Sequence, residues 1–341
     1  MTPSQKTNDL GPALVLMLLA PLLTEVLPGA TRFSSIFVLP VEICVWGGGA
    51  LIIRYAVRRR QLGWINMLFL ALALSLAEEC IIQQTSLAPL VIRLKGETYA
   101  RAFGVNYVYL LWALIYESVF VVFLPIYLVE FIFPGRRERL WISKAGFFVL
   151  IPFFVLACSV AWFSWTRIAR TKVFHVPVYN PPLMAVILSL LLIIGFVYAG
   201  LSRRPALSAP LPTHVQKLPA PVLLVILGVG WATLLYGLVL LGFGIAPHFP
   251  VLVALFAGIV LSWLPIYLLP RWTSDQNWRP KHRFALIFGV ATGAMLVGFI
   301  GFMGTTGPDL YFKIITNVIA VTLLILLGRK TIKPNVNYAT G

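Results

Sequence analysis

Residues 64–84 read WINMLFLALALSLAEECIIQQ, an apolar run interrupted near its end by two adjacent acids, Glu78 and Glu79. About 20 apolar residues in helical conformation cross the hydrocarbon layer of a bilayer, so this run predicts a transmembrane helix. A charged side chain at mid-bilayer costs about 2.5 kcal/mol or more. Two acids retained in such a run therefore indicate a function.

The rest of the chain has the same character. Of its 341 residues, 60% are hydrophobic and 11% are charged, whereas soluble proteins carry charges at roughly 25% of positions. We predict an all-α integral membrane protein, a bundle of ten transmembrane helices in a single polytopic domain, residues 1–341. The predicted spans are 11–29, 36–57, 64–84, 105–133, 145–166, 182–201, 221–245, 249–269, 284–304 and 310–328.

The basic residues predict the orientation of the bundle. Most of the 27 Lys and Arg residues lie in alternate loops, which the positive-inside rule places on the cytoplasmic side together with both termini. The first span is expected to remain uncleaved. The net charge of +16 is spread over short loops, whereas nucleic-acid binding needs one basic face, so the lipid bilayer is the expected partner and nucleic acid is excluded.

Six of the eleven acidic residues fall in or beside predicted spans, and they are Glu25, Glu42, Glu78, Glu79, Glu117 and Glu130. The predicted orientation places the first five in the outer half of the membrane. Glu130 is expected near the cytoplasmic surface, reaching water or Arg136. If the four glutamate-bearing helices, residues 11–133, pack together, their five carboxyls form one acidic chamber open to the outside.

Helical spacing adds polar neighbours to this chamber. Ser75 and Gln83 lie four residues before and after Glu79 and share its face on an α-helix. Tyr109 and Tyr116 form a stripe beside Glu117, where a phenol could hold a carboxyl by a hydrogen bond.

Three chemistries fit such a cluster. Carboxylates crowded in a low dielectric cannot all be ionised, which suits proton relay or general acid–base work by Glu78, Glu79 and Glu117. They could instead bind a small cation or a cationic solute, with Glu25 and Glu42 at the entrance. They could also be protonated acids that only join helices. No predicted span contains a histidine, so we predict no metal site, and the sequence identifies no cofactor.

Glycines predict where helices approach closely. Gly47, Gly48 and Gly49 permit such an approach in the second span. Residues 145–328 are expected to be a glycine-rich packing half, with seams at Gly289 and Gly293 and at every seventh residue from 230 to 244. Asp309 and Lys313, four residues apart, are expected to neutralise each other.

One short motif resembles a known family. The segment Glu78-Glu79-Cys80-Ile81-Ile82-Gln83 resembles the EExxxR motif of the CPBP-type intramembrane proteases, the group that contains the CAAX-prenyl endopeptidases. The resemblance implies that the first glutamate activates a water molecule. In this chain Gln83 stands at the Arg position, and Glu117 lies near the expected second motif, which has no histidine here.

A broader resemblance covers residues 20–135. Ala20-Pro21 with Glu25, the Trp46–Ala50 segment with Arg54, and Gly63-Trp64 look like segments of a group of uncharacterised bacterial polytopic membrane proteins. This resemblance implies a location in the cell (inner, plasma) membrane and supplies no activity.

Three functions therefore remain open. The first is proton- or cation-linked transport or binding of a small solute. The second is a CPBP-like, glutamate-dependent protease, and the third is a non-catalytic relative or scaffold subunit. The sequence leaves undecided whether the protein is an enzyme.

Overall fold

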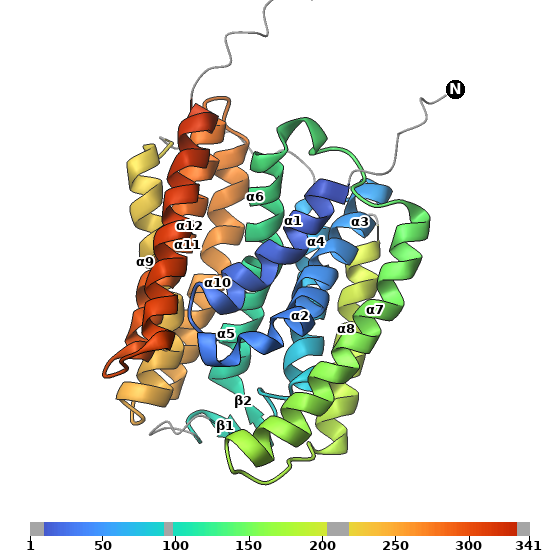
Figure 1. Ribbon diagram of the computed structural model, residues 1–341, viewed down its shortest axis with the longest axis vertical. Helices are drawn as coiled ribbons and strands as arrows, with labels where there is room; N and C mark the ends of the chain where they lie inside the picture. The colour runs from blue at the N-terminus through green and yellow to red at the C-terminus, as the bar shows by residue number, and fades with distance from the viewer. Residues whose placement is uncertain (1–9, 92–97, 203–217, 333–341) are drawn as a thin grey trace, which may run out of the picture.

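The computed structural model describes residues 10–91, 98–202 and 218–332. Within these residues, nine helices are long and apolar enough to cross a membrane, and a shorter apolar helix covers Leu10–Val26. The fold is thus an all-α, multi-pass membrane bundle (Figure 1). The first of the ten predicted spans is shorter than the other nine.

The glutamate-bearing part of the chain alternates α-helix with other helical forms. Its elements are α1 (Leu10–Pro21), η1 (Leu22–Val26), η2 (Phe33–Val38), α2 (Leu39–Glu42), η3 (Ile43–Gly47), α3 (Gly48–Arg60), α4 (Trp64–Ala77), η4 (Glu78–Ile82), β1 (Arg101–Ala102), β2 (Val105–Asn106), α5 (Tyr107–Glu117), η5 (Ser118–Phe123) and α6 (Leu124–Ile132). The strands β1 and β2 pair as a short antiparallel hairpin.

The remaining elements follow a loop that contains the short helix η6 (Pro134–Arg136). They are α7 (Lys144–Phe163), η7 (Ser164–Val173), α8 (Leu183–Leu201), α9 (Pro221–Val239), η9 (Leu240–Ile245), α10 (Val251–Thr273), α11 (Pro280–Gly298), η10 (Phe299–Phe302) and α12 (Pro308–Ile332).

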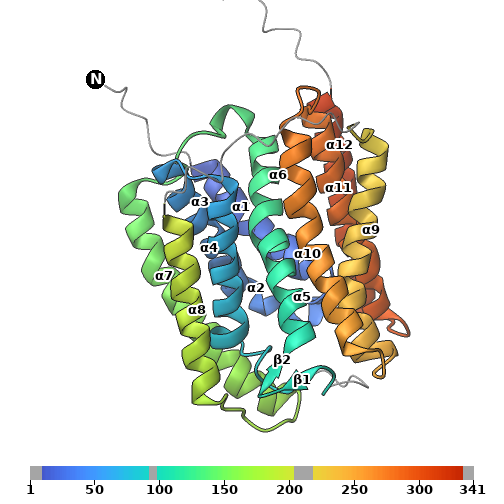
Figure 2. The same ribbon diagram turned by 180° about the vertical axis from the view of Figure 1, so that it is seen from behind.

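The span made of α5, η5 and α6 lies at the centre of the bundle. Helices α7 and α8 pack on α3 and α4 at one side of it, and α9 to α12 form the other side (Figures 1 and 2). In the Tyr107–Ile132 span 72% of the most apolar window is buried, against 11% for Lys144–Val173. The central span is therefore shielded by protein, while α7 presents apolar side chains to lipid.

The two ends of the bundle differ in chemistry. One end, here called the basic end, carries Arg58, Arg59 and Arg60 of α3 and the loop after α6, and the described chain both begins and finishes there (Figure 1). The opposite end carries the β1–β2 hairpin and is called the hairpin end. The shared end of the described termini agrees with an even number of spans. The cytoplasmic assignment of the basic end stays a prediction.

The three consecutive glycines each meet a different helix. A Cβ on Gly47 would lie 2.2 Å from the carbonyl oxygen of Met17 in α1. A Cβ on Gly49 would lie 2.7 Å from Leu74 in α4, and one on Gly48 would touch Phe154 in α7. This confirms the predicted close approach and makes the second span the junction of three neighbours.

The predicted packing glycines of α11 are confirmed, whereas the prediction for those of α9 is wrong. Cβ atoms on Gly289 and Gly293 would lie 2.3 Å and 2.9 Å from atoms of α9. In α9 the close approach comes at Gly228, whereas the glycines at 230, 237 and 244 have no atom within 4 Å of an added Cβ. A spacing of seven residues does not identify which helix face meets a neighbour.

The expected pair of Asp309 and Lys313 is wrong as well. Asp309 accepts hydrogen bonds of 2.9 Å from the backbone N–H and the hydroxyl of Ser34. Lys313 is buried and donates to the backbone oxygens of Leu27 and, at 3.1 Å, Met295. Backbone carbonyls near helix ends lack helical partners and can accept the Lys313 ammonium, while the Asp309 carboxylate is occupied by Ser34.

We predict that Gly289→Ala lowers the stability of the protein, because the added methyl would collide with backbone atoms of Val225. Overpacking of this kind costs about 1–3 kcal/mol. Thermal unfolding in detergent should show a clear drop in the melting temperature. Gly237→Ala is the matched control, since its methyl meets open space and alanine favours the helix. Equal melting temperatures for the two variants would contradict the packing described here.

Candidate functional site

Five glutamates from four spans converge inside the bundle. The carboxyl cluster consists of Glu25 at the end of the first helix, Glu42 in α2, Glu78 and Glu79 in η4, and Glu117 at the end of α5. Glu78 lies close enough to Glu25, Glu42 and Glu79 for their charges to interact, and Glu117 lies within the same range of Glu78 and Glu79. All except Glu25, which is partly buried, are buried.

Glu79 and Glu117 lie next to each other in the cluster. Their carboxyls lie within hydrogen-bonding reach of each other. Glu79 also accepts a hydrogen bond of 2.6 Å from the hydroxyl of Ser86. The hydroxyl of Ser75 lies beside Glu117 and donates to the carbonyl of Ala113 at 3.2 Å. Two carboxyls in such contact cannot both be ionised, so the pair holds at least one proton.

Glu42 and Glu25 lie side by side in the part of the cluster formed by the first two spans. The Glu42 carboxyl accepts a hydrogen bond of 2.5 Å from the hydroxyl of Thr31. The backbone carbonyl of Glu25 accepts bonds from Gly29 at 3.1 Å and Thr31 at 3.0 Å. The turn between the two spans therefore fixes Glu25 through its backbone and Glu42 through its side chain.

Gln83 has a different partner from the one that α-helical spacing predicts. Its side chain lies near the carboxyl of Glu78, five residues earlier. The reason is that residues 78–82 are π-helical, with the backbone N–H of Gln83 donating to the carbonyl of Glu78 at 2.8 Å. A π-helix aligns residues five apart, so Gln83 moves from the face of Glu79 to that of Glu78.

Each of the four glutamate-bearing spans contains such a π-helical segment. They are η1, η3, η4 and η5, and each contains or directly follows a glutamate of the cluster. Segments of this type are rare, and those that occur are often found at functional sites. They interrupt the regular α-helical hydrogen bonds and change the direction in which side chains point. Two further π-helical segments among the described residues, η7 and η9, lie outside these spans. The feature that the four glutamate-bearing spans share is therefore that their π-helical segments adjoin the carboxyls.

The two tyrosines predicted beside Glu117 lie at the cluster. The Tyr109 phenol is within electrostatic range of Glu79 and Glu117. Tyr116 donates its hydroxyl to the backbone carbonyl of Thr24, the residue before Glu25. The expected phenol–carboxyl bond is thus wrong for Tyr116, which holds the backbone of the first span instead. Its ring stacks on Trp112 at 4.7 Å between centroids.

The cluster has no ion-pair partner within residues 10–91, 98–202 and 218–332. All ion pairs there involve Glu130 or Glu138. One oxygen each of Glu42 and Glu78 is buried without a hydrogen-bond partner in the described part of the chain. Among the same residues, no three His, Cys, Asp or Glu side chains are grouped closely enough to hold a metal ion. The buried negative charge is therefore left to protons or to a positively charged ligand.

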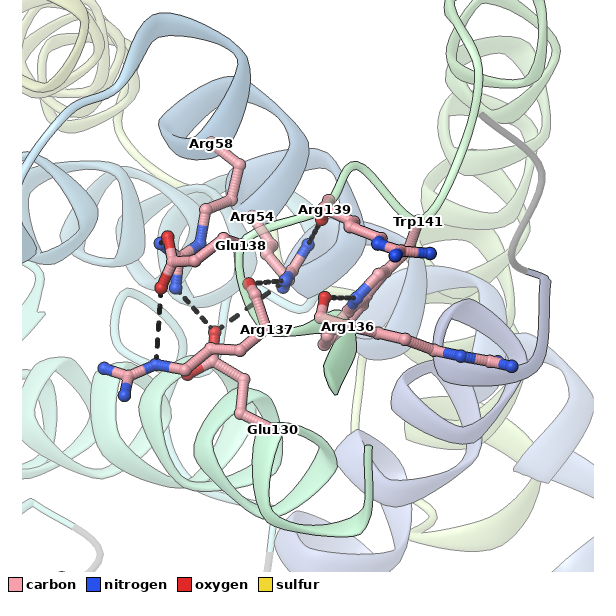
Figure 3. A network of polar contacts seen from close by, with 8 residues as sticks. All are labelled: Arg54, Arg58, Glu130, Arg136, Arg137, Glu138, Arg139 and Trp141. Carbon is pink, nitrogen blue, oxygen red and sulfur yellow. Dashed lines mark hydrogen bonds and ion pairs between the residues drawn. The ribbon is translucent and has the colours of Figure 1, made fainter. Parts of the chain in front are cut away.

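Glu130 belongs to a separate network at the basic end (Figure 3). It is buried, so the expectation that it reaches water is wrong. Its carboxyl pairs with Arg58 at 2.8 Å and with Arg137 at 3.2 Å. Arg54 is also buried and lies 3.8 Å from Glu130.

One histidine, His282, lies inside a membrane-spanning helix, although no predicted span contains a histidine. His282 is in the first turn of α11, which begins at Pro280, four residues before the predicted start. Its Nδ1 accepts the backbone N–H of Arg279 at 3.0 Å, and its ring stacks on Trp278. It caps the helix at the basic end, whereas the cluster lies toward the hairpin end (Figure 1).

Sequence reasoning missed three polar residues of the site. Thr31 and Ser86 lie just outside predicted spans, and each holds a carboxyl directly. Tyr236 of α9 packs edge-on against the ring of Tyr116 at 5.6 Å. Thr31 and Ser86 could have been found by looking for hydroxyl residues within a few positions of each predicted span end. A loop can fold back over the helix that precedes it and place such a hydroxyl against a carboxyl.

The sequence matches no protein-family model, no curated protein and no solved structure. The proposals below therefore depend on the geometry of the chain itself.

We predict that the Glu79–Glu117 pair carries a proton at neutral pH. Infrared spectroscopy should show a protonated carboxyl band that shifts on exchange into D₂O, because a buried acid keeps its proton when a second acid shares the site. Glu117→Gln should remove much of this band, whereas Glu138→Gln, at an exposed position, should leave it unchanged. A neutral-pH spectrum without the band would show that the pair is ionised.

Proposed function

We propose that this protein is a multi-pass carrier of the plasma membrane that binds protons at the carboxyl cluster and links them to movement of a small cation or cationic solute. The observation that carries the proposal is the convergence of five carboxyls from four spans with no ion-pair partner in the described residues. Intramembrane acids of this kind form proton relays and ion sites in pumps and transporters.

In this proposal Glu79 and Glu117 hold the exchangeable proton. Their contact allows a proton to pass between them without a large movement of either side chain. Glu42 and Glu78, each with a free buried oxygen, would receive the cation. Glu25 interacts with Glu42, Glu78 and Glu79, so it connects the two parts electrostatically.

The cluster is linked to the hairpin end by a loop that reaches the Glu79 carboxyl. The loop that holds Ser86 is fixed by Asn106, whose side-chain amide donates to the carbonyls of Thr85 at 3.0 Å and Ala88 at 2.8 Å. Arg101 donates to the carbonyl of Leu87 at 2.7 Å. A hydrogen-bonded segment thus runs from the hairpin to the Glu79 carboxyl, on the side that the predicted orientation makes external.

A single observation favours hydrolysis as a second candidate. Glu78, the first acid of the EExxxQ motif, is buried, and one of its oxygens has no partner in the described part of the chain. That oxygen could accept a proton from water. The neighbours of Glu78 are further carboxyls and Gln83, which makes this candidate weaker than proton binding. If the protein is a protease, Glu78→Gln should abolish cleavage of a membrane peptide, and Glu42→Gln should still cleave that peptide.

We predict proton movement coupled to a cation gradient in proteoliposomes. Vesicles would contain a pH-sensitive dye and receive gradients of Na⁺, K⁺ or methylammonium in turn, at a clamped membrane potential. At least one gradient should change the internal pH in wild-type vesicles. Glu79→Gln should abolish the change, because an amide neither binds nor releases a proton near neutral pH. Asp275→Asn, which changes an acid in the loop between α10 and α11, should retain it.

Two results would contradict the proposed function. One is a response to a cation gradient that survives in both Glu79→Gln and Glu117→Gln. The other is a folded wild-type protein that responds to none of the three gradients.

A further inference from the structure

The basic end is closed by a network that joins the second and fourth spans. This clamp consists of Arg54 and Arg58 of α3, Glu130 of α6, and Arg137 and Glu138 of the loop that follows (Figure 3). Arg58 lies 2.8 Å from Glu130 and 2.6 Å from Glu138. Arg137 lies 3.2 Å from Glu130 and 3.6 Å from Glu138. Both arginines therefore share the same two acids.

One part of the clamp is fixed. Arg54 donates to the backbone carbonyls of Arg139 at 3.1 Å and Arg137 at 2.7 Å. Its guanidinium lies 3.1 Å from the centre of the Trp141 ring, and the Trp141 indole donates to the carbonyl of Arg136 at 2.9 Å. These contacts hold the loop after α6 against α3 whether or not the ion pairs are formed.

The other part of the clamp can be released. The side chain of Glu130 is 4% exposed, whereas those of Arg58 and Arg137 are 25% and 43% exposed and that of Glu138 is 74% exposed. The two arginines can turn from Glu130 to Glu138 or to water without becoming buried, unpaired cations. A small displacement of α6 relative to α3 is therefore enough to separate Glu130 from its partners.

The same two spans connect the clamp to the carboxyl cluster. Glu42 and Arg54 lie on one continuous helix with the π-helical η3 between them, about 12 residues or roughly 18 Å apart. Glu117 and Glu130 are joined in the same way through η5. A π-helical segment that tightens to an α-helix rotates and shifts everything beyond it. Each span can thus convert a change at the cluster into movement at the clamp.

We propose that the Arg58–Glu130–Arg137 part of the clamp is a closed gate at the basic end of the pathway through the carboxyl cluster. A change in the charge bound at the cluster alters η3 and η5 and so opens it. The proposal deepens the proposed function, because it identifies the barrier that must separate the cluster from the basic end.

Ser118 offers a position at which to measure the opening of the gate. It is buried, lies between Glu117 and Glu130, and its hydroxyl has no hydrogen-bond partner among the described residues. We would introduce Ser118→Cys into the full chain after replacing its three cysteines by serine. A membrane-impermeant methanethiosulfonate with a quaternary ammonium group would then be added from the basic side of oriented vesicles.

Glu130→Gln should raise the modification rate by about tenfold or more, the range of typical coupling between two states. The conservative variant Glu130→Asp, which keeps a carboxylate beside Arg58 and Arg137, should react more slowly than Glu130→Gln. Asp309→Asn, which changes an acid at the other end of the bundle, is the matched control. If Glu130→Gln fails to fold, Arg137→Gln takes its place, because that side chain is partly exposed. An unchanged rate in a folded clamp variant would overturn the gate.

The coupling to the cluster has a separate test. Glu42→Gln, which leaves the clamp residues intact, should change the modification rate of the cysteine at position 118 by about threefold or more. A rate equal to that of the parent would overturn the link through the π-helical segments. Neither measurement requires a transported solute, so failure of the gate is distinguishable from failure of proton-linked transport, which the dye-loaded vesicles report.

Discussion

The cost of an unpaired charge in an apolar medium determines how this protein arranges its polar side chains. Along its spans, the structure meets this constraint in three ways. At the basic end, Glu130 is surrounded by arginines. Deeper in the bundle, Lys313 is surrounded by backbone oxygens. In the carboxyl cluster, acids face other acids. Only the third arrangement lacks a positive or neutralising partner within the described chain. Protons or bound cations can supply that partner.

Close packing makes the cluster possible. The second span can approach α1, α4 and α7 together because Gly47, Gly48 and Gly49 remove side chains from three directions. The central span is enclosed by α9 and α10 on its other side. The four glutamate-bearing helices are thereby held at distances at which their acids interact, and the π-helical segments then adjust which residues face inward. Helix packing determines the distances between the acids, and the local helix geometry determines which side chains face inward.

The sequence predicted the spans and the five acids of the cluster because both follow from hydropathy and spacing alone. It failed where the outcome depended on a neighbour. Gln83 was expected on the face of Glu79 but lies near Glu78. No residue pattern in this segment predicts the π-helix that causes this difference. The seam at Gly228 was missed because only the position of α11 selects that face of α9. Thr31 and Ser86 were missed because loops had been treated as connections, although both fold back onto a carboxyl.

Lys313 also has a consequence for the order in which the protein is made. Its helix, α12, is synthesised after the other described helices, and the carbonyl oxygens that accept its ammonium belong to Leu27 and Met295. An isolated helix with this lysine would enter lipid with its charge unsatisfied. The Lys313 ammonium therefore has both of these acceptors only when the first helix, synthesised hundreds of residues earlier, stands beside α11. A polypeptide without the first helix would therefore leave the Lys313 ammonium without the Leu27 carbonyl that accepts it.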